Sequence, residues 1–176
     1  MELILLMAMT LDGKIARNSN EIVDWTGKAD KKYFVEITQE AGVVIMGSRT
    51  FDTIGKPLAG RKNIVMTRNK SRNRKTKKEN LVFTDQPPNE IIKGLQEEGF
   101  EKAALIGGAM INSLFVKENL ITEIHVTLVP VLFGKGLSLF NDTLFDESLN
   151  LKLEFKESRE LDQGHLLLIY RVLSCG

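Results

Sequence analysis

The sequence predicts an α/β protein of three layers, with helices on both faces of a sheet that is parallel first and antiparallel last. Residues 43–67 predict a strand, a helix, a loop and a strand, and residues 103–119 repeat the order of apolar strand, glycine turn and apolar helix. Residues 151–156 and 165–173 read as strands joined by a turn, which predicts an antiparallel pair at the end of the sheet.

Length and composition predict one globular unit. With 176 residues and 43% hydrophobic content, residues 1–176 have the apolar side chains for one sizeable core, so we expect a single domain. The only cysteine, Cys175, has no partner for an internal disulfide, which fits a reducing compartment and excludes a cysteine-based zinc site. The two histidines lack clustered acids, so we expect no metal site. The apolar run 3–9 is too short to span a bilayer and Glu2 replaces the basic start of a secretory signal, so we expect a cytoplasmic protein.

The first elements follow from residues 3–40. Residues 3–9 are continuously apolar, which is typical of a central strand covered on both faces. Residues 10–25 are rich in Asp, Asn, Ser and Gly without a sustained period, and such a long connection indicates a lid over a site. Residues 29–40 space their apolar side chains as a helix does, with Asp30 in the first turn.

The organising unit, residues 43–67, contains a candidate anion site. Its first strand ends in Gly-Ser-Arg-Thr at residues 47–50, which places free backbone N–H groups, two hydroxyls and a guanidinium at a helix N-terminus. An anionic phosphate is favoured at such a position. The alternative is a strand-to-helix turn in which Ser48 is the N-cap and Arg49 is solvated.

A second glycine turn follows later in the chain. Residues 81–83 predict a short strand, and the prolines that open residues 87–99 introduce a helix. Gly107 and Gly108 then lie between an apolar strand and an apolar helix, where they allow a ligand to approach the backbone. Two such turns at the carboxyl ends of parallel strands indicate a dinucleotide crevice, whereas the alternative is that the glycines only relieve crowding. Residues 121–132 alternate and predict a further strand.

The segment 68–78 is strongly basic. It holds seven basic residues and no acidic one, although the whole chain has 24 basic and 23 acidic residues. A solvated loop explains such a run, and a phosphate-bearing ligand could also face it. A nucleic-acid-binding module that uses it as an arm is a function of another class. We rank that function below an enzyme because the run has no interleaved aromatic side chain on which bases could stack.

The sequence resembles two reductase families. VIMGSRTFDTIGKPLAGRKNIVMT, WTGKADKKYF and IGG resemble dihydrofolate reductase, and the FGKG segment is similar to dimeric reductases of thermophilic bacteria. This resemblance implies a dihydrofolate-reductase-like fold, NADPH as cofactor, and reduction of 7,8-dihydrofolate to tetrahydrofolate. It also implies a homodimer, which we expect through the apolar residues 126–140. TLDGKIA, GGAMINSLF and ITEIHVTLVPVLFGKG resemble instead the reductase domain of riboflavin biosynthesis, which shares fold and cofactor and acts on a ribosylamino-pyrimidine 5′-phosphate.

The resemblance to folate reductases implies particular substrate residues. Asp30 has the spacing from Trp25 and Phe34 at which that family places its catalytic acid, which hydrogen-bonds the pterin and favours protonation of the imine. The alternative is an acid that stabilises the helix N-terminus. Arg61, at the end of KPLAGR, matches the arginine that grips the α-carboxylate of the glutamate tail, or else is a surface arginine. The implied substrate-binding residues are Ala8, Trp25, Phe34, Ile54, Leu58, Arg61 and Thr127.

Both families imply the same cofactor residues. These are Ala8, Ala16, Gly47, Ser48, Arg49, Thr50, Thr67, Arg68, Ile106, Gly107, Gly108 and Ala109. Arg49 and Arg68 favour NADP over NAD, because an acid contacting the ribose would be expected for NAD. Asn112 departs from the folate pattern, since many folate reductases have an aromatic residue there, and this favours the riboflavin-type reductase.

Overall fold

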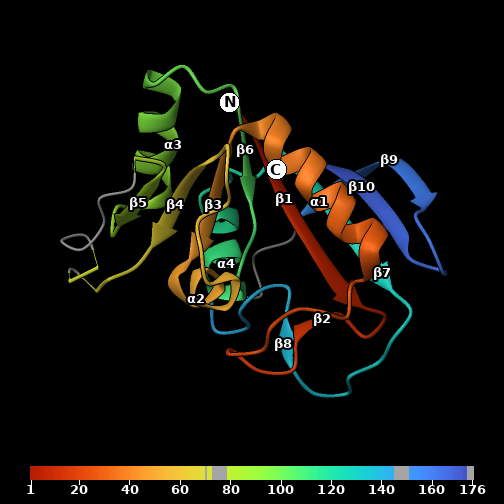
Figure 1. The fold of residues 1–176 in the computed structure, drawn as a ribbon. Coiled ribbons are helices and arrows are strands. Elements are labelled where there is room, and N and C mark those ends of the chain that lie inside the picture. Colours follow the sequence, from red (N-terminus) through yellow and green to blue (C-terminus); the bar gives the residue numbers. More distant parts are fainter. Residues whose placement is uncertain (70, 73–78, 145–150, 174–176) are drawn as a thin grey trace.

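One eight-stranded sheet runs through the computed structural model, which describes residues 1–69, 71–72, 79–144 and 151–173 (Figure 1). The strand order is β5-β4-β3-β6-β1-β7-β10-β9, and β2 and β8 form a separate two-stranded sheet. The elements are β1 (Glu2–Thr10), β2 (Lys14–Ala16), α1 (Gly27–Ala41), β3 (Val43–Gly47), α2 (Ser48–Ile54), β4 (Lys62–Met66), β5 (Leu81–Thr84), α3 (Pro88–Glu97), β6 (Lys102–Leu105), α4 (Ala109–Lys117), β7 (Glu123–Val129), β8 (Leu137–Ser138), β9 (Lys152–Glu160) and β10 (Leu166–Leu173).

The strand directions confirm the predicted sheet. The strands from β5 to β7 pair in parallel, and β10 pairs antiparallel with both β7 and β9. Strand β1 lies between β6 and β7, so the apolar run near the N-terminus forms a central strand as predicted. Because the parallel strands share one direction, the loops that follow them gather at one edge of the sheet.

Successive side chains of β1 belong alternately to two cores, one on each face of the sheet. Leu3 and Leu5 pack with the apolar side chains of α3 and α4, whereas Ile4 and Leu6 pack with those of α1 and α2. Helix α1 crosses the sheet in front of β1 (Figure 1). Helices therefore cover both faces of the strand, which explains why its sequence is apolar at successive positions. None of the described helices is both long and apolar enough to cross a membrane.

Of residues 126–140, through which we expect a homodimer, those that belong to β7 lie inside the sheet. Strand β7 pairs with β1 on one side and β10 on the other, and Val126 and Val129 are only 4% and 2% exposed. Strand β9 is an edge strand of the sheet, and Phe155 on it is 58% exposed. Alternation records a half-buried strand without showing which strands lie beside it. A homodimer through residues 126–140 therefore stays a prediction.

The predicted lid contains regular structure. Lys14 and Ala16 of β2 pair with Ser138 and Leu137 of β8, and this small sheet lies beyond the carboxyl end of β1 (Figure 1). Gly136 stands next to this pair with φ of 153°, a conformation that L side chains rarely adopt. A Cβ atom there would lie 2.4 Å from the backbone oxygen of Ala16. The lid therefore needs glycine at this position.

Gly136→Ala should destabilise the protein by about 2–4 kcal/mol, because the backbone must leave its conformation and the β2–β8 contact must open. Gly134→Ala is the matched control: φ is 72° there, but no heavy atom lies within 4 Å of the added Cβ. We expect the control to lose about 1 kcal/mol. Urea unfolding followed by the fluorescence of Trp25, the single tryptophan, measures both changes. Equal losses would show that the contact with Ala16 is unimportant.

Candidate active site

The two glycine turns of the sequence lie side by side at the carboxyl edge of the sheet. Their strands, β3 and β6, are parallel neighbours. The Gly47 N–H donates a hydrogen bond of 2.8 Å to the Gly107 carbonyl. The Thr50 hydroxyl oxygen lies 3.6 Å from the point where a Cβ of Gly108 would stand. The structure therefore brings together the two turns that we expected to form a dinucleotide crevice.

Close packing explains why these turns carry glycine. A Cβ on Gly47 would lie 2.9 Å from Cγ1 of Ile111 on α4. A Cβ on Gly107, where φ is 92°, would lie 3.1 Å from the sulfur and the terminal methyl carbon of Met7. The peptide bond between Gly107 and Gly108 is cis. A side chain at Gly47 would therefore press against helix α4, and one at Gly107 would need a backbone conformation that L residues rarely adopt.

Both helices that leave the turns begin with backbone N–H groups that no described side chain caps. Glycine is the N-cap of α2 and of α4, and neither helix has a side-chain capping bond. Ser48 is the first residue of α2, so its alternative role as N-cap is wrong. Arg49 is exposed, and Ile106 and Ala109 flank the second turn. Unsatisfied N–H groups beside a guanidinium fit the phosphates of NADPH.

Part of the basic segment lies near the same crevice. Thr67 and Arg68 follow β4, the parallel neighbour of β3, and Arg68 is exposed. Arg72 makes two bonds of 2.8 Å to the carboxylate of Asp52 on α2, and these bonds raise the pKa of Arg72. This fork ties the segment to the helix that begins at the first glycine turn. Cys175, Lys70 and residues 73–78 of the basic segment lie outside the described residues.

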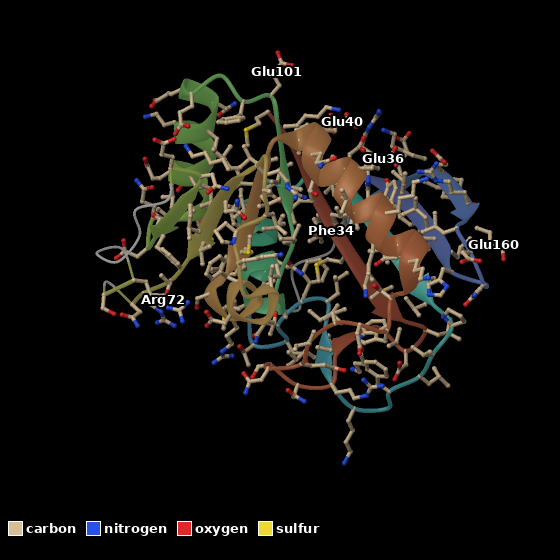
Figure 2. The ribbon with its side chains drawn as sticks, viewed as in Figure 1. Phe34, Glu36, Glu40, Arg72, Glu101 and Glu160 are labelled. Carbon is tan, nitrogen blue, oxygen red and sulfur yellow. The ribbon has the colours of Figure 1, made fainter. Side chains whose placement is uncertain are left out.

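One face of α1 carries the residues predicted to meet the substrate. Asp30, Phe34 and Thr38 recur every four residues, so they share one face of the helix. Phe34 packs into the core with Ile54 and Leu58, while the exposed Glu36 points away from the sheet (Figure 2). At the start of this face Asp30 is half-buried, and its carboxylate has no hydrogen-bond or ion-pair partner among the described residues.

Arg61 is a buried cation at the other end of that face. It is 8% exposed, so the alternative of a surface arginine is wrong. Its Nε donates to the Ala59 carbonyl at 3.0 Å and its Nη1 to the Thr38 hydroxyl at 2.7 Å. No carboxylate pairs with it in the described part of the chain, and desolvation lowers its pKa. Asp30 and Thr38 are about 12 Å apart along the helix axis.

Asn63 holds the loop that carries Leu58 and Arg61. Its side chain is fully buried in β4, accepts a bond of 2.9 Å from the Leu58 N–H, and donates to the carbonyls of Leu58 and Arg61 at 3.0 and 2.8 Å. Our sequence reasoning missed this residue. A polar residue at the start of an otherwise apolar strand was the available signal, since a buried amide needs several partners.

The floor between the helix and the crevice consists of β1 and β7. Ala8 and Thr127 are directly opposite each other in this parallel pair, and Thr127 is fully buried. Thr127 shares its face of β7 with His125, whose Nδ1 lies 2.8 Å from the Tyr33 hydroxyl and whose Nε2 lies 3.1 Å from Glu123. Burial lowers the pKa of His125. His125 therefore serves a structural network.

Asp12 and Phe133, two residues that our sequence reasoning missed, hold the lid against the segment after β7. Asp12 accepts bonds from the Thr10 hydroxyl at 2.5 Å and from the N–H groups of Phe133 and Gly134 at 3.2 and 2.7 Å. The Phe133 ring contacts Trp25 edge-on at 5.0 Å between centroids. The Arg17 guanidinium lies 3.8 Å from the ring centre. These contacts join the lid to the segment after β7, and Ala16 of β2 lies buried beside them.

Two other kinds of site receive no support. Among the residues that the structure describes, no group of three acids, histidines or cysteines could hold a metal ion. A shallow concavity of about 410 Å³ lies at the opposite edge of the sheet, beside Glu2, Thr122 and Arg171. None of the predicted site residues lines it. The candidate active site is therefore the region between the lid, α1 and the glycine turns.

The fold and the paired glycine turns define a class of NADPH-dependent reductases, and comparison with known proteins identifies the family. Residues 2–167 match the RibD C-terminal domain family, and the chain belongs to it. A candidate dihydrofolate reductase of Caenorhabditis elegans is 33% identical over 138 residues, which cover 71% of this chain and 70% of that protein. The chain is accordingly an NADPH-dependent oxidoreductase.

Solved structures share the fold. A protein of Shewanella sp. PV-4 whose name proposes a role in riboflavin biosynthesis superposes with a TM-score of 0.82 at 23% identity, covering 98% of this chain and 99% of that one. RibD of Acinetobacter baumannii superposes with a TM-score of 0.84 at 20% identity, covering 98% of this chain and 58% of that one. At these identities the likeness concerns the fold.

The contribution of Asp12 to the stability of the folded protein should depend on pH. The Thr10 hydroxyl, followed by the Phe133 and Gly134 amides, lowers the pKa of Asp12 from 3.8 to about 2. A carboxylate whose pKa is lower in the folded than in the unfolded state stabilises the folded state at any pH above its unfolded-state pKa. This stabilisation is lost as the pH falls through its folded-state pKa. Asp12→Asn should therefore destabilise the protein at neutral pH, by a difference that shrinks between about pH 4 and pH 2. Urea unfolding across this range tests it, and a constant difference would contradict it.

Proposed function

We propose that the protein reduces 7,8-dihydrofolate to 5,6,7,8-tetrahydrofolate with NADPH. The observation that supports this best is a pair of charges without partners among the described residues: the carboxylate of Asp30 on α1, and the buried guanidinium of Arg61, which bonds to Thr38 on the same face of that helix. Such a face suits an elongated ligand with a hydrogen-bonding heterocycle at one end and an anion at the other. A pterin with a glutamate tail has this form.

Asp30 would hold the heterocycle. An ionised carboxylate only accepts hydrogen bonds, so it pairs with an amino group and a ring N–H on one edge of the pterin. A negative charge there favours a proton on the imine nitrogen next to the reacting carbon. NADPH, when bound in the crevice between the glycine turns, supplies the hydride.

Arg61 would hold the tail. The bonds to Ala59 and Thr38 use its Nε and Nη1, which fixes the plane of the guanidinium and leaves further N–H donors for a ligand. A carboxylate then binds a cation whose orientation is already set, so little side-chain freedom is lost on binding. Leu58, Ile54 and Phe34 offer the apolar contacts between the two polar ends.

A second candidate is reduction of a ribosylamino-pyrimidine 5′-phosphate, as in riboflavin biosynthesis. The family match favours it, and so does Asn112, where an aromatic neighbour of the reacting rings was expected of a folate reductase. In this reaction Arg61 would bind the phosphate, which suits a guanidinium as well as a carboxylate does. Asp30 would then pair with an amino or ring N–H group of the pyrimidine. We place this function second because Asp30 and Arg61 stand at the positions that the resemblance to folate reductases gives to the acid and to the tail-binding arginine.

The proposal includes a cytoplasmic homodimer. Apolar residues suited to an interface remain exposed on β9 and β10 (Leu153, Phe155, Leu166 and Leu173) and in the segment after β7 (Leu132 and Leu137). Contact through such side chains removes apolar surface from water. Light scattering at micromolar concentration would show twice the mass of 19.8 kDa, and a monomeric mass would refute the dimer.

The substrate is tested by following the oxidation of NADPH at its absorbance band with each compound in turn. We expect turnover with 7,8-dihydrofolate and much slower turnover with the ribosylamino-pyrimidine phosphate. Turnover of the pyrimidine alone would replace the proposed function by the second candidate. Turnover of neither would refute both.

Substitutions of Asp30 and of Arg61 should impair the enzyme in different ways. Asp30→Asn should slow hydride transfer with little change in NADPH affinity, because size is kept and the ionisable group is lost. Arg61→Ala should weaken dihydrofolate binding by about 1.5–3 kcal/mol, mainly through the Michaelis constant. Lys62→Ala is the matched control, because it removes a neighbouring charge that pairs with Glu98. An unchanged Michaelis constant in Arg61→Ala, or full turnover in Asp30→Asn, would contradict the assigned roles.

A further inference from the structure

Asn112 carries a buried acceptor without a partner. Three described side-chain atoms are buried with no hydrogen bond, namely Trp25 Nε1, Asn112 Oδ1 and His165 Nε2. Of these residues only Asn112 is completely buried. Leaving a buried polar atom unpaired is unfavourable, and native proteins contain few such atoms. The amide oxygen of Asn112 therefore needs a hydrogen-bond donor that the described residues do not supply.

The other end of the amide fixes the direction of this oxygen. Nδ2 of Asn112 donates a bond of 2.8 Å to the Leu139 carbonyl. A carbonyl oxygen only accepts hydrogen bonds, so the nitrogen must face Leu139 and the oxygen must point the other way. Oδ1 lies 3.9 Å from the point where a Cβ of Gly107 would stand. The oxygen is thus directed at the second glycine turn of the cofactor crevice.

Met7 adjoins the same point. Its sulfur and terminal methyl carbon lie 3.1 Å from the Cβ position of Gly107, on the side chain's flexible end. Met7 is half-buried and belongs to β1, the strand that lies beside β6. A methionine side chain has three rotatable bonds and adapts its shape readily. The Met7 side chain covers this region of the turn, and a ligand group could displace it.

We propose that Oδ1 of Asn112 accepts a hydrogen bond from the carboxamide N–H of the nicotinamide ring. NADPH has donors in its ribose hydroxyls, its adenine amino group and its carboxamide, and the carboxamide is the donor on the hydride-carrying ring, with two N–H groups. A bond there would fix the rotation of the ring at the edge of the sheet, which makes Asn112 a cofactor-binding residue. The inference rests on NADPH and is independent of which substrate is reduced.

Binding of two cofactors to the whole protein tests the proposal without any turnover. Reduced 3-acetylpyridine adenine dinucleotide phosphate has a methyl group in place of the carboxamide NH₂. Isothermal titration calorimetry should show that the native protein binds NADPH roughly 3- to 10-fold more tightly than this analogue. Asn112→Leu, which has similar volume and no acceptor, should bind both cofactors equally. Asn112→Ala removes the same oxygen without bulk and serves if the leucine variant does not fold.

Two controls separate binding from structure. Ser113→Ala removes the neighbouring bond of 2.8 Å from the Asn141 N–H to the Ser113 hydroxyl, and it should keep the native preference. Adenosine 2′,5′-bisphosphate, which lacks nicotinamide, should bind the native protein and the Asn112 variants equally. Equal binding of both cofactors by the native protein would overturn the proposal. It would also be overturned if the Asn112 variants weakened both cofactors by one factor, or if Ser113→Ala abolished the preference.

Discussion

The hydrogen bond from Gly47 to Gly107 is the contact on which the geometry of the site depends. It joins the ends of β3 and β6 at 2.8 Å, and glycine in both turns lets Ile111 and Met7 pack closely against them. Helices α2 and α4 then begin next to each other with their first N–H groups uncapped. Two helix N-termini and Arg49 create a positive edge in a protein whose formal net charge is only +1. An anionic dinucleotide is attracted to that edge, not to the protein as a whole.

Helix α1 shows how function and stability compete in this fold. The buried Thr38 hydroxyl accepts a hydrogen bond from Arg61, and no acid in the described part of the chain neutralises this buried arginine. A buried cation without a counter-ion is unfavourable, so the protein retains a local cost that a well-packed leucine would avoid. Asn63 satisfies the carbonyl groups of the same loop and so holds the backbone of Arg61 in place. We interpret the unmatched charge as a place prepared for an anionic ligand.

The lid connects distant parts of the chain to this site. Asp12 binds the amides of Phe133 and Gly134, and Asn112 and Ser113 of α4 bind the backbone of Leu139 and Asn141. The segment after β7 is therefore attached to the lid at one end and to the helix of the second glycine turn at the other. A ligand that changes the position of Asn112 would act on the same segment that closes the site.

The sequence by itself determined the architecture and much of the site. Continuous apolar runs, glycine turns and alternating strands predicted the sheet with its change from parallel to antiparallel, because backbone period and glycine conformation are local properties. They also placed Gly47 and Gly107 at strand ends, and the motifs around them indicated a reductase that uses NADPH. Only the tertiary structure decided which residues meet. Partners far away in the chain determine that β7 is interior, that Arg61 is buried and that Asp12 bonds to the Phe133 amide. They also determine that Oδ1 of Asn112 has no partner among the described residues. A local pattern shows which side of an element is buried, but it does not show what lies on that side.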